Sequence, residues 1–285
     1  MLERDGYPAG VPCWADVIQP DLDATMAFYD GLFGWVFEVR TPEGAPSGYA
    51  YARLDGLLVG GVGGPPAQAE TPDGWTTYVW VDSADATVAA VTANGGRVVA
   101  APVDIPRAGR TALCADPWGA TFGLWQPAQN RGAQLVNAPG SWNFSDLRTP
   151  DPGRAEAFYG AVFGWVANPF EIQPGQKSWM LRRPGYGEFL AERDPEIRER
   201  HEADQAPDGF TDAVAWMDQA TEGEPAHWGI TFAVGDADAA FARAIALGAT
   251  EVTPLFDTEY TRMGAVRDPQ GAVLTLSEYR PPDHG

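Results

Sequence analysis

DLDATMAFYDGLFGW, residues 21 to 35, decides the fold, because the chain repeats it as DPGRAEAFYGAVFGW at residues 151 to 165. The copies lie 130 residues apart, and alignment places the FY pair and the FGW triplet of one on those of the other. A match of this length at one spacing indicates an internal duplication. The chain is therefore predicted to contain two equivalent halves.

Each copy of the repeat is predicted to be an amphipathic helix with its own start and stop. Asp21 and Asp151 are good N-cap residues, and apolar residues follow them at helical spacing. Gly34 and Gly164 end the helices, because glycine readily adopts the left-handed backbone found after a last turn. Packing of two such helices on a core does not explain why the FY and FGW residues match.

Strand-like segments flank each helix and give a unit of one strand, one helix and three strands. The first unit has strands near 11–20, 36–40, 49–54 and 57–62. The second begins at Trp75, and the third and fourth span about 142–217 and 228–276. Residues 130–140 have no periodicity, so we expect one domain at 1–129 and another at 140–285.

Composition limits the classes of partner. The 285 residues include 39 acidic and 19 basic side chains, for a formal net charge of −20. No basic stripe is present to neutralise phosphates, so we expect no nucleic-acid partner. No segment approaches the roughly 18 apolar residues of a membrane helix, and the amino terminus lacks an export signal, so we expect no membrane association and a cytoplasmic location. Cys13 and Cys114 are expected to be free thiols.

The four units, the repeat and the D-P-x-G turns at Asp116 and Asp268 resemble the glyoxalase, bleomycin-resistance and extradiol-dioxygenase superfamily, the vicinal oxygen chelate fold. The openings WADVIQPD and FSDLRTPD look most like two-domain actinobacterial glyoxalase-like proteins, some of which are labelled hydroxylases. The resemblance covers nearly the whole chain. It implies an α+β fold of two tandem domains, in which four βαβββ modules form cupped mixed sheets.

The resemblance also implies that metal-dependent members hold a divalent ion on the concave face through His, Gln or Glu. The matching positions in this chain carry other residues: Trp14, Thr76 and Gly123, then Phe144, Gly229 and Thr275. Indole, phenyl and glycine groups cannot coordinate a metal, and threonine is a poor ligand. His201, His227 and His284 fall outside these positions, with His227 the nearest to one. We therefore predict no bound metal and no other cofactor.

Strand alternation predicts the lining of each cup, because side chains at i and i+2 share a face. The first cup is predicted to carry one carboxylate, one threonine and four aromatic residues: Asp16, Thr76, Trp14, Tyr78, Trp80 and Trp125. The second, with Phe144 and Asp146, is predicted to be smaller and more polar. Aromatic walls suit a planar aromatic ligand and attract cations. The alternative is that these rings fill the core.

Asp16 and Asp146 are a matched pair of carboxylates on the two cup faces. Burial raises the pKa of a carboxyl, which suits a general acid or base, although a structural role for both is the alternative. We therefore expect a metal-independent protein that acts on a small aromatic or planar metabolite, as an enzyme of natural-product metabolism using Asp16. The alternatives are a non-catalytic drug-binding or metabolite-binding protein of the bleomycin-resistance type and, less well matched, a metal-dependent lyase or dioxygenase.

The sequence offers expectations for three further features. The charged insertion at 188–210 is either a solvated helix or a lid over a cavity. Arg110 and Arg262 each precede a D-P-x-G turn by six residues, and each is expected to hold that hairpin through a salt bridge. A monomer is expected to suffice, because the duplication supplies within one chain the pairing of units that a homodimer would otherwise provide. A homodimer remains open.

Overall fold

Each half of the chain forms one eight-stranded mixed sheet. The computed structural model describes residues 3–41, 47–65, 74–173 and 176–281. The first sheet has the strand order β2-β3-β4-β1-β5-β8-β7-β6, and the second has the order β10-β11-β12-β9-β13-β16-β15-β14. The two orders correspond strand for strand, which confirms the predicted α+β fold of two tandem domains.

Four modules supply these strands, two to each sheet. Module 1 contains β1 (Pro12–Ile18), α1 (Leu22–Phe33), β2 (Val36–Val39), β3 (Tyr49–Leu54) and β4 (Leu57–Gly63). Module 2 contains β5 (Trp75–Trp80), α2 (Ala84–Ala93), β6 (Arg97–Ile105), β7 (Gly109–Ala115) and β8 (Thr121–Pro127). Module 3 contains β9 (Trp142–Thr149), α3 (Pro152–Phe163), β10 (Val166–Gln173), β11 (Gln176–Arg182) and β12 (Ala213–Gln219). Module 4 contains β13 (His227–Ala233), α6 (Ala237–Ala246), β14 (Thr250–Asp257), β15 (Thr261–Arg267) and β16 (Val273–Tyr279).

The repeated helices α1 and α3 begin and end as their sequences predict. The Asp21 side chain accepts the N–H of Ala24 at 3.0 Å, which satisfies one of the free amide groups of the first turn. Asp151 does the same for α3. Gly34 and Gly164 have φ angles of 73° and 72°, the left-handed conformation that costs glycine little.

The repeated aromatic residues join the two domains. Tyr29 stacks on Trp35 with ring centroids 5.4 Å apart, and its hydroxyl donates to Oδ2 of Asp268 in the other domain at 2.9 Å. The indole N–H of Trp35 donates to the Gly140 carbonyl at 2.7 Å. These buried polar contacts fix the relative orientation of the two halves, because a buried donor without an acceptor is costly.

The second copy makes the same contacts in the opposite direction. The Tyr159 hydroxyl donates to Oδ2 of Asp116 at 3.1 Å, and the Trp165 indole donates to the Gly10 carbonyl at 2.6 Å. The other oxygen of Asp116 accepts the backbone N–H groups of its own D-P-x-G turn. Each turn aspartate therefore closes a hairpin with one oxygen and binds the opposite domain with the other, which accounts for the matched FY and FGW residues.

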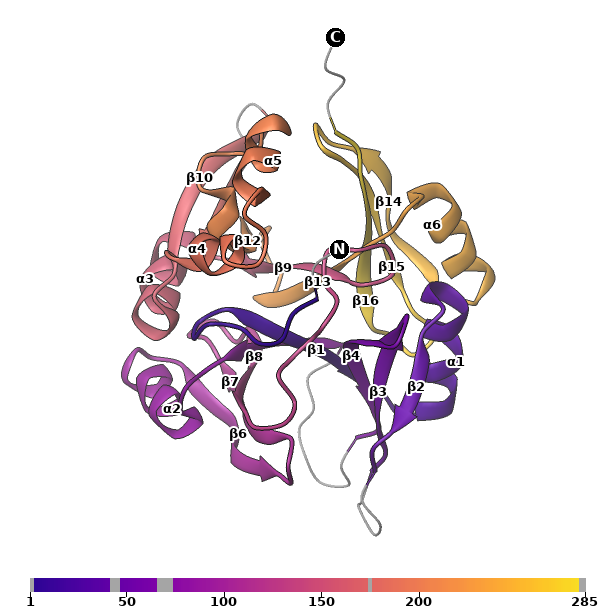
Figure 1. Ribbon diagram of the computed structural model, residues 1–285, viewed down its shortest axis with the longest axis horizontal. Helices are drawn as coiled ribbons and strands as arrows, with labels where there is room; N and C mark the ends of the chain where they lie inside the picture. The colour runs from indigo at the N-terminus through magenta and orange to yellow at the C-terminus, as the bar shows by residue number, and fades with distance from the viewer. Residues whose placement is uncertain (1–2, 42–46, 66–73, 174–175, 282–285) are drawn as a thin grey trace.

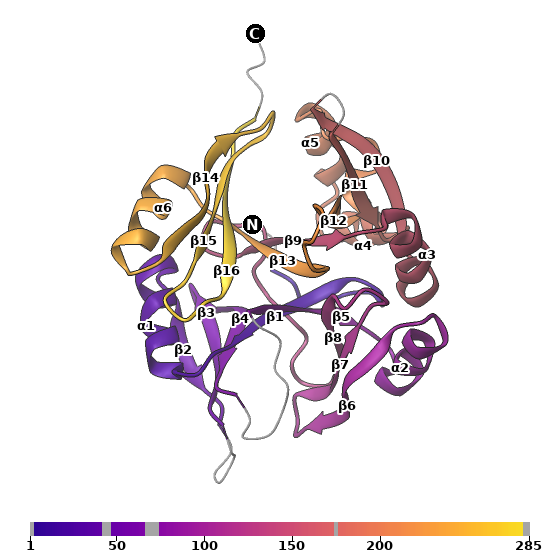
Figure 2. The ribbon, with the colours of Figure 1, turned by 180° about the vertical axis from the view of Figure 1, so that it is seen from behind.

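Figures 1 and 2 show how the halves are stacked. Helix α1 lies beside α6, α2 lies beside α3, and the central strands of the two sheets meet between these helix pairs. The hydroxyl groups of Thr77 in β5 and Ser145 in β9 are 2.6 Å apart across this contact. The concave faces of the two sheets consequently open away from each other. None of the helices in the described ranges combines the length and hydropathy needed to span a bilayer.

The matched arginines form salt bridges, but their partners lie outside the D-P-x-G hairpins that they were expected to hold. Arg110 binds Asp104 of the β6–β7 hairpin at 2.9 Å and Asp85 of α2 at 3.0 Å. Arg262 makes the equivalent pairs with Asp257 and with Asp238 of α6. Each arginine therefore joins a helix to the neighbouring β6–β7 or β14–β15 hairpin. These pairs are partly solvated, so each contributes little to the free energy of unfolding.

Candidate functional site

The concave face of the second sheet carries a row of three residues on adjacent strands. Trp216 of β12 is the register partner of Asp146 in β9, and Asp146 is the partner of Gly229 in β13. Residues paired in this way point to the same face of a sheet, so the Trp216 indole and the Asp146 carboxyl are neighbours. A Cβ placed on Gly229 would have its nearest contact at 3.6 Å, with the backbone oxygen of Asp146. The space beside the carboxyl is therefore open.

A cavity of about 1680 Å³ lies over this row and extends towards the linker at 136–139. Module 3 gives it an aromatic side, in which Phe144 and Phe170 contact Trp216 with centroids 5.6 and 5.4 Å from the indole. Module 4 gives it hydroxyl groups, which belong to Thr231, Thr275 and Ser277. One side of the cavity can thus stack on a flat ligand while the other forms hydrogen bonds with it.

Asp146 is the carboxyl at the floor of this cavity. Its Oδ2 accepts the Thr231 hydroxyl at 2.8 Å. Burial raises the pKa of Asp146 to about 6, although its side chain still faces the cavity. The charge of Asp218 adds to this rise. The hydrogen bond from Thr231 and the charge of Arg148 oppose it. Arg148 and Asp218 pair with each other at 3.4 Å on the next row of the sheet. A carboxyl with this pKa can release or take up a proton near neutral pH.

The equivalent row of the first sheet is Gly61, Asp16 and Thr76, and two tyrosine rings fill the space above it. A Cβ on Gly61 would overlap the Tyr49 hydroxyl, and a Cβ on Gly123 would overlap the Tyr78 ring. The absence of side chains at these glycines is what lets the rings lie against the sheet. Ser178 and Thr231 occupy the places of Tyr49 and Tyr78 in the second sheet, and their smaller size leaves that cup open.

Comparison with known proteins agrees with this architecture. The model of the "Glyoxalase/Bleomycin resistance protein/Dioxygenase superfamily" matches residues 14–124, and the "Glyoxalase-like domain" model matches residues 144–277. The "Putative glyoxylase CFP32" of Mycobacterium tuberculosis (strain CDC 1551 / Oshkosh) is 34% identical over 284 residues, covering 99% of both chains. The chain belongs to the glyoxalase and bleomycin-resistance superfamily. "Anthracycline biosynthesis protein DnrV" of Streptomyces peucetius is 32% identical and covers 96% of this chain and 95% of its own.

Solved structures of the superfamily share the fold. The Mn(II)-bound glyoxalase from Novosphingobium aromaticivorans aligns with a TM-score of 0.59 and 15% identity over 96% of this chain and 84% of its own. The 2,2',3-trihydroxybiphenyl 1,2-dioxygenase from Sphingomonas wittichii strain RW1 aligns with a TM-score of 0.57 and 16% identity, covering 95% and 91% of the two chains. At these identities the likeness concerns the fold alone.

The superfamily's metal positions lack suitable donors in this member. Among the residues of the four described ranges, no group of three or more His, Cys, Asp and Glu side chains is arranged to hold a metal ion. His227 starts β13 and is exposed, with its Nδ1 2.9 Å from the Pro225 carbonyl oxygen. His201 lies in the insertion of module 3, and His284 lies outside the described residues. This donor set does not fit the metal centre that the superfamily implies, and the expected absence of a metal or other cofactor stays a prediction.

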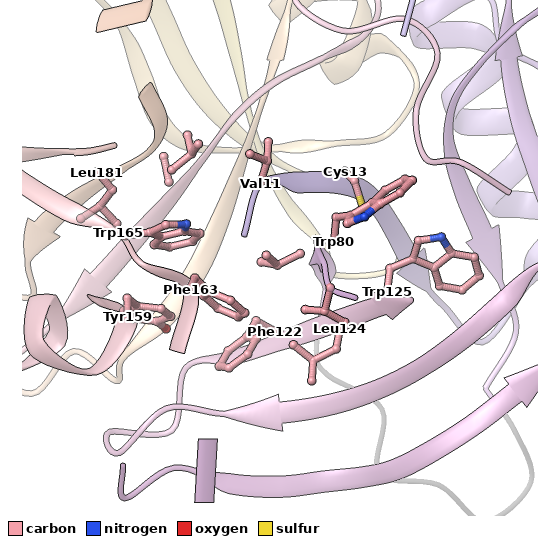
Figure 3. Close-up of a cluster of buried hydrophobic side chains, with 14 of the residues drawn as sticks. Val11, Cys13, Trp80, Phe122, Leu124, Trp125, Tyr159, Phe163, Trp165 and Leu181 are labelled. Atoms are coloured by element: carbon pink, nitrogen blue, oxygen red, sulfur yellow. The ribbon is translucent and has the colours of Figure 1, made fainter. Parts of the chain in front are cut away.

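The three tryptophans predicted to line the first cup of this superfamily member are buried. Trp14, Trp80 and Trp125 are 4%, 8% and 7% exposed. The indole N–H groups of Trp14 and Trp125 are already bonded, to the Tyr49 hydroxyl and the Asn130 carbonyl. Figure 3 shows Trp80 and Trp125 in one buried cluster with aromatic residues of the other domain. Their proposed contact with a ligand stays a prediction, whereas their burial favours a core role.

The expectation that the second cup is the smaller one stays a prediction, because the cavity of about 1680 Å³ over the second cup also runs along the linker and the amino-terminal segment. Rings that face a concave surface can fill it, and in the first cup Tyr49 and Tyr78 lie directly against the sheet. Phe144 and Asp146 therefore line the open cup, while Asp16 and Thr76 are buried beneath rings, at 5% and 2% exposure.

Asp16 is enclosed by hydrogen bonds and burial. Its Oδ2 accepts the Tyr49 hydroxyl at 2.9 Å, and its Oδ1 is buried without a partner of standard geometry in the part of the chain that is described. Burial raises the pKa of Asp16 to about 7, and the hydroxyl groups of Tyr49 and Tyr78 oppose the rise. The ionised form of this carboxyl is therefore unfavourable in the folded state.

This burial predicts how stability depends on pH. The folded pKa of Asp16, about 7, lies above its ordinary value of 3.8, so folding favours the protonated form and the free energy of unfolding falls as pH rises between these values. Asparagine at this position does not titrate. Between pH 4 and pH 8 we expect the free energy of unfolding of the parent to fall by on the order of 4 kcal/mol relative to that of Asp16→Asn. Urea unfolding of both proteins across this range measures the difference, and parallel pH profiles would contradict the prediction.

Proposed function

We propose that the protein binds a planar aromatic metabolite in the second cup and acts on it with Asp146 as general acid or base. The observation that carries this proposal is the row in which the Trp216 ring lies beside the Asp146 carboxyl and Gly229 leaves room for a ligand. A ring stacked on Trp216 would bring its substituents next to a carboxyl able to exchange a proton near neutral pH. Asp146 takes the role first expected of Asp16, because rings cover Asp16.

The relatives support an aromatic natural product as ligand. Two proteins about a third identical to this chain, DauV of Streptomyces sp. (strain C5) and DnrV of Streptomyces peucetius, are named for anthracycline biosynthesis. The aromatic side of the second cup is compatible with ligands of that shape. The acid or base role of Asp146, and chemistry that needs no metal, form part of the proposal.

Binding without catalysis is the second candidate, and the charge around the second cup favours it. The lining includes three carboxylates, Glu171, Glu224 and Glu259, that form no salt bridge with an arginine within the described residues, in a chain of net charge −20. Such a rim attracts cationic ligands and would suit a protein that sequesters a basic drug. Turnover of a bound ligand separates the two candidates.

Trp216→Ala tests the site itself. If the indole stacks on the ligand, we expect its loss to weaken binding of 1,4-dihydroxyanthraquinone by about 1–3 kcal/mol, roughly 5- to 150-fold. Quenching of tryptophan fluorescence or calorimetry measures the affinity. Trp179→Ala is the matched control, because Trp179 packs against the core on the other face of the sheet. Equal affinities of Trp216→Ala and the parent would place the aromatic site elsewhere.

A further inference from the structure

Modules 1 and 3 are copies of each other, and they differ in the connection between their third and fourth strands. In module 1 only Asp55 and Gly56 join β3 to β4. In module 3, residues 183–212 join β11 to β12 and contain α4 (Tyr186–Ala191), α5 (Ile197–Ala203) and the 3₁₀ turn η1 (Phe210–Asp212). We call residues 183–212 the module 3 insertion. It belongs to the half whose cup is open.

The base of the module 3 insertion is fixed. The Asp212 side chain accepts the N–H of Gly187 at 2.6 Å, which joins the start and end of the insertion. Arg193 pairs with Asp5 of the amino-terminal segment at 2.8 Å and lies over the Phe189 ring at 4.3 Å. These contacts hold the insertion against the rest of the protein at one side of the cup.

The far part of the insertion reaches the opposite wall. Figure 1 shows α5 and the tip of the β14–β15 hairpin facing each other across the mouth of the second sheet. The hydroxyl of Tyr260 in that hairpin donates to the Gln205 carbonyl at 3.1 Å. Between these ends, Ile197, His201 and Phe210 line the cavity. The insertion therefore spans the cup from module 3 to module 4.

His201 is the polar group that the insertion brings to the cavity. Its Nδ1 lies 3.1 Å from the Thr211 hydroxyl, and its ring meets the Phe210 ring edge-on at 5.0 Å. These two contacts orient the ring, and within the described ranges neither of them uses its other nitrogen, Nε2. A ligand in the cup would then have Asp146 on the floor and His201 in the insertion as hydrogen-bonding groups.

The aromatic side of the cup indicates the class of ligand. The rings of Phe144, Phe170 and Phe210 each contact the Trp216 indole, with centroids 5.6, 5.4 and 6.2 Å away. Several fused rings with oxygen substituents would cover more of this aromatic side than a single ring, and they would also reach the hydroxyl groups of module 4.

We propose that the module 3 insertion is a roof that closes over a fused multi-ring aromatic ligand, with His201 as the residue of the roof that determines specificity. This inference rests on the proposed function of the second cup. It assigns to Tyr260 one of the contacts with module 4 that must break when the ligand enters or leaves; the contact of Tyr279 with Asp204 is another.

Two variants and two probes test the roof, with 1,4-dihydroxyanthraquinone as the fused-ring probe and catechol as the single-ring probe. We expect the parent to prefer the fused-ring probe. His201→Phe keeps the ring contact with Phe210 but removes the nitrogen, so it should weaken binding of that probe about tenfold and leave catechol unchanged. Tyr260→Phe should speed dissociation of the fused-ring probe several-fold in stopped-flow measurements without lowering the melting temperature.

The outcomes separate this inference from the proposed function. If the parent binds the fused-ring probe and both variants behave like the parent, the insertion is not a roof over the ligand, although the proposed function stands. If catechol binds as tightly as the fused-ring probe, the multi-ring class is wrong. If the parent binds neither probe, the proposed function fails and the inference fails with it. His227→Phe shows whether an effect is specific to the insertion, since His227 is an exposed histidine that lines the same cavity from β13.

Discussion

Asp146→Asn is expected to lower turnover about a hundred- to ten-thousandfold while affinity for the aromatic ligand stays within a few fold. Asparagine has the size of aspartate and can still accept the Thr231 hydroxyl, but it cannot exchange a proton. If Asp146 acts as a base, kcat/KM of the parent should also rise with pH through about 6. Steady-state kinetics on an aromatic ligand that the parent protein converts, with the affinity measured in parallel, check both expectations.

Asp16→Asn is the matched control for this experiment. Asp16 is the counterpart of Asp146 in a cup filled by Tyr49 and Tyr78, so its replacement should leave turnover unchanged and alter only the dependence of stability on pH. Full activity in Asp146→Asn would remove Asp146 from the chemistry, and loss of activity in Asp16→Asn alone would return the catalytic role to the first cup. A parent protein that binds the ligand without turnover would support the sequestering alternative.

Trp80→Ala is expected to lower the free energy of unfolding by about 3–5 kcal/mol, the usual cost of truncating a buried aromatic residue. The Trp80 ring packs against Tyr7 at 6.2 Å and lies under the Arg131 guanidinium at 5.5 Å, so truncation leaves a cavity where three segments meet. Binding of the ligand in the second cup should not change. Urea unfolding and a binding titration on the same variant measure both quantities.

The opposite result would be informative about the first cup. If Trp80→Ala folded with the stability of the parent but lost ligand affinity, the ring would face a ligand and not the core. The first cup would then have to open in solution, against the close fit of Tyr78 over Gly123.

Periodicity and the repeat predicted the order of helices and strands, and the resemblance to the superfamily supplied the cupped sheets. Caps such as Asp21 and stops such as Gly34 are local features, and strand alternation placed Trp14, Asp16 and Tyr78 on one face. The interdomain bonds of Tyr29 and Tyr159 could not be predicted in this way. They join residues more than 40 positions apart, and nothing local identifies their acceptors.

Which cup is open could not be predicted from the residue types on its face. The answer depends on the register between neighbouring strands, because Tyr49 fills the first cup only where Gly61 lets its hydroxyl lie against the sheet. The run LLVGGVG in β4 is the signal that could have indicated this, since glycine in a strand often marks the close approach of another group. Trp216 was missed because the insertion before β12 removes any fixed spacing from the repeated helix.

The exchange of contacts between the halves, in which Tyr29 meets Asp268 and Tyr159 meets Asp116, gives this architecture a freedom that an assembly of identical subunits lacks. In a symmetric dimer every substitution occurs twice, so a tyrosine that fills the cup of one subunit also fills the cup of the other. Fusion into a single polypeptide removes that constraint. Here Tyr49 occupies the first cup and Ser178 leaves the second cup open, while the shared interface holds the two domains together. One half can thus be selected for rigidity and the other for chemistry.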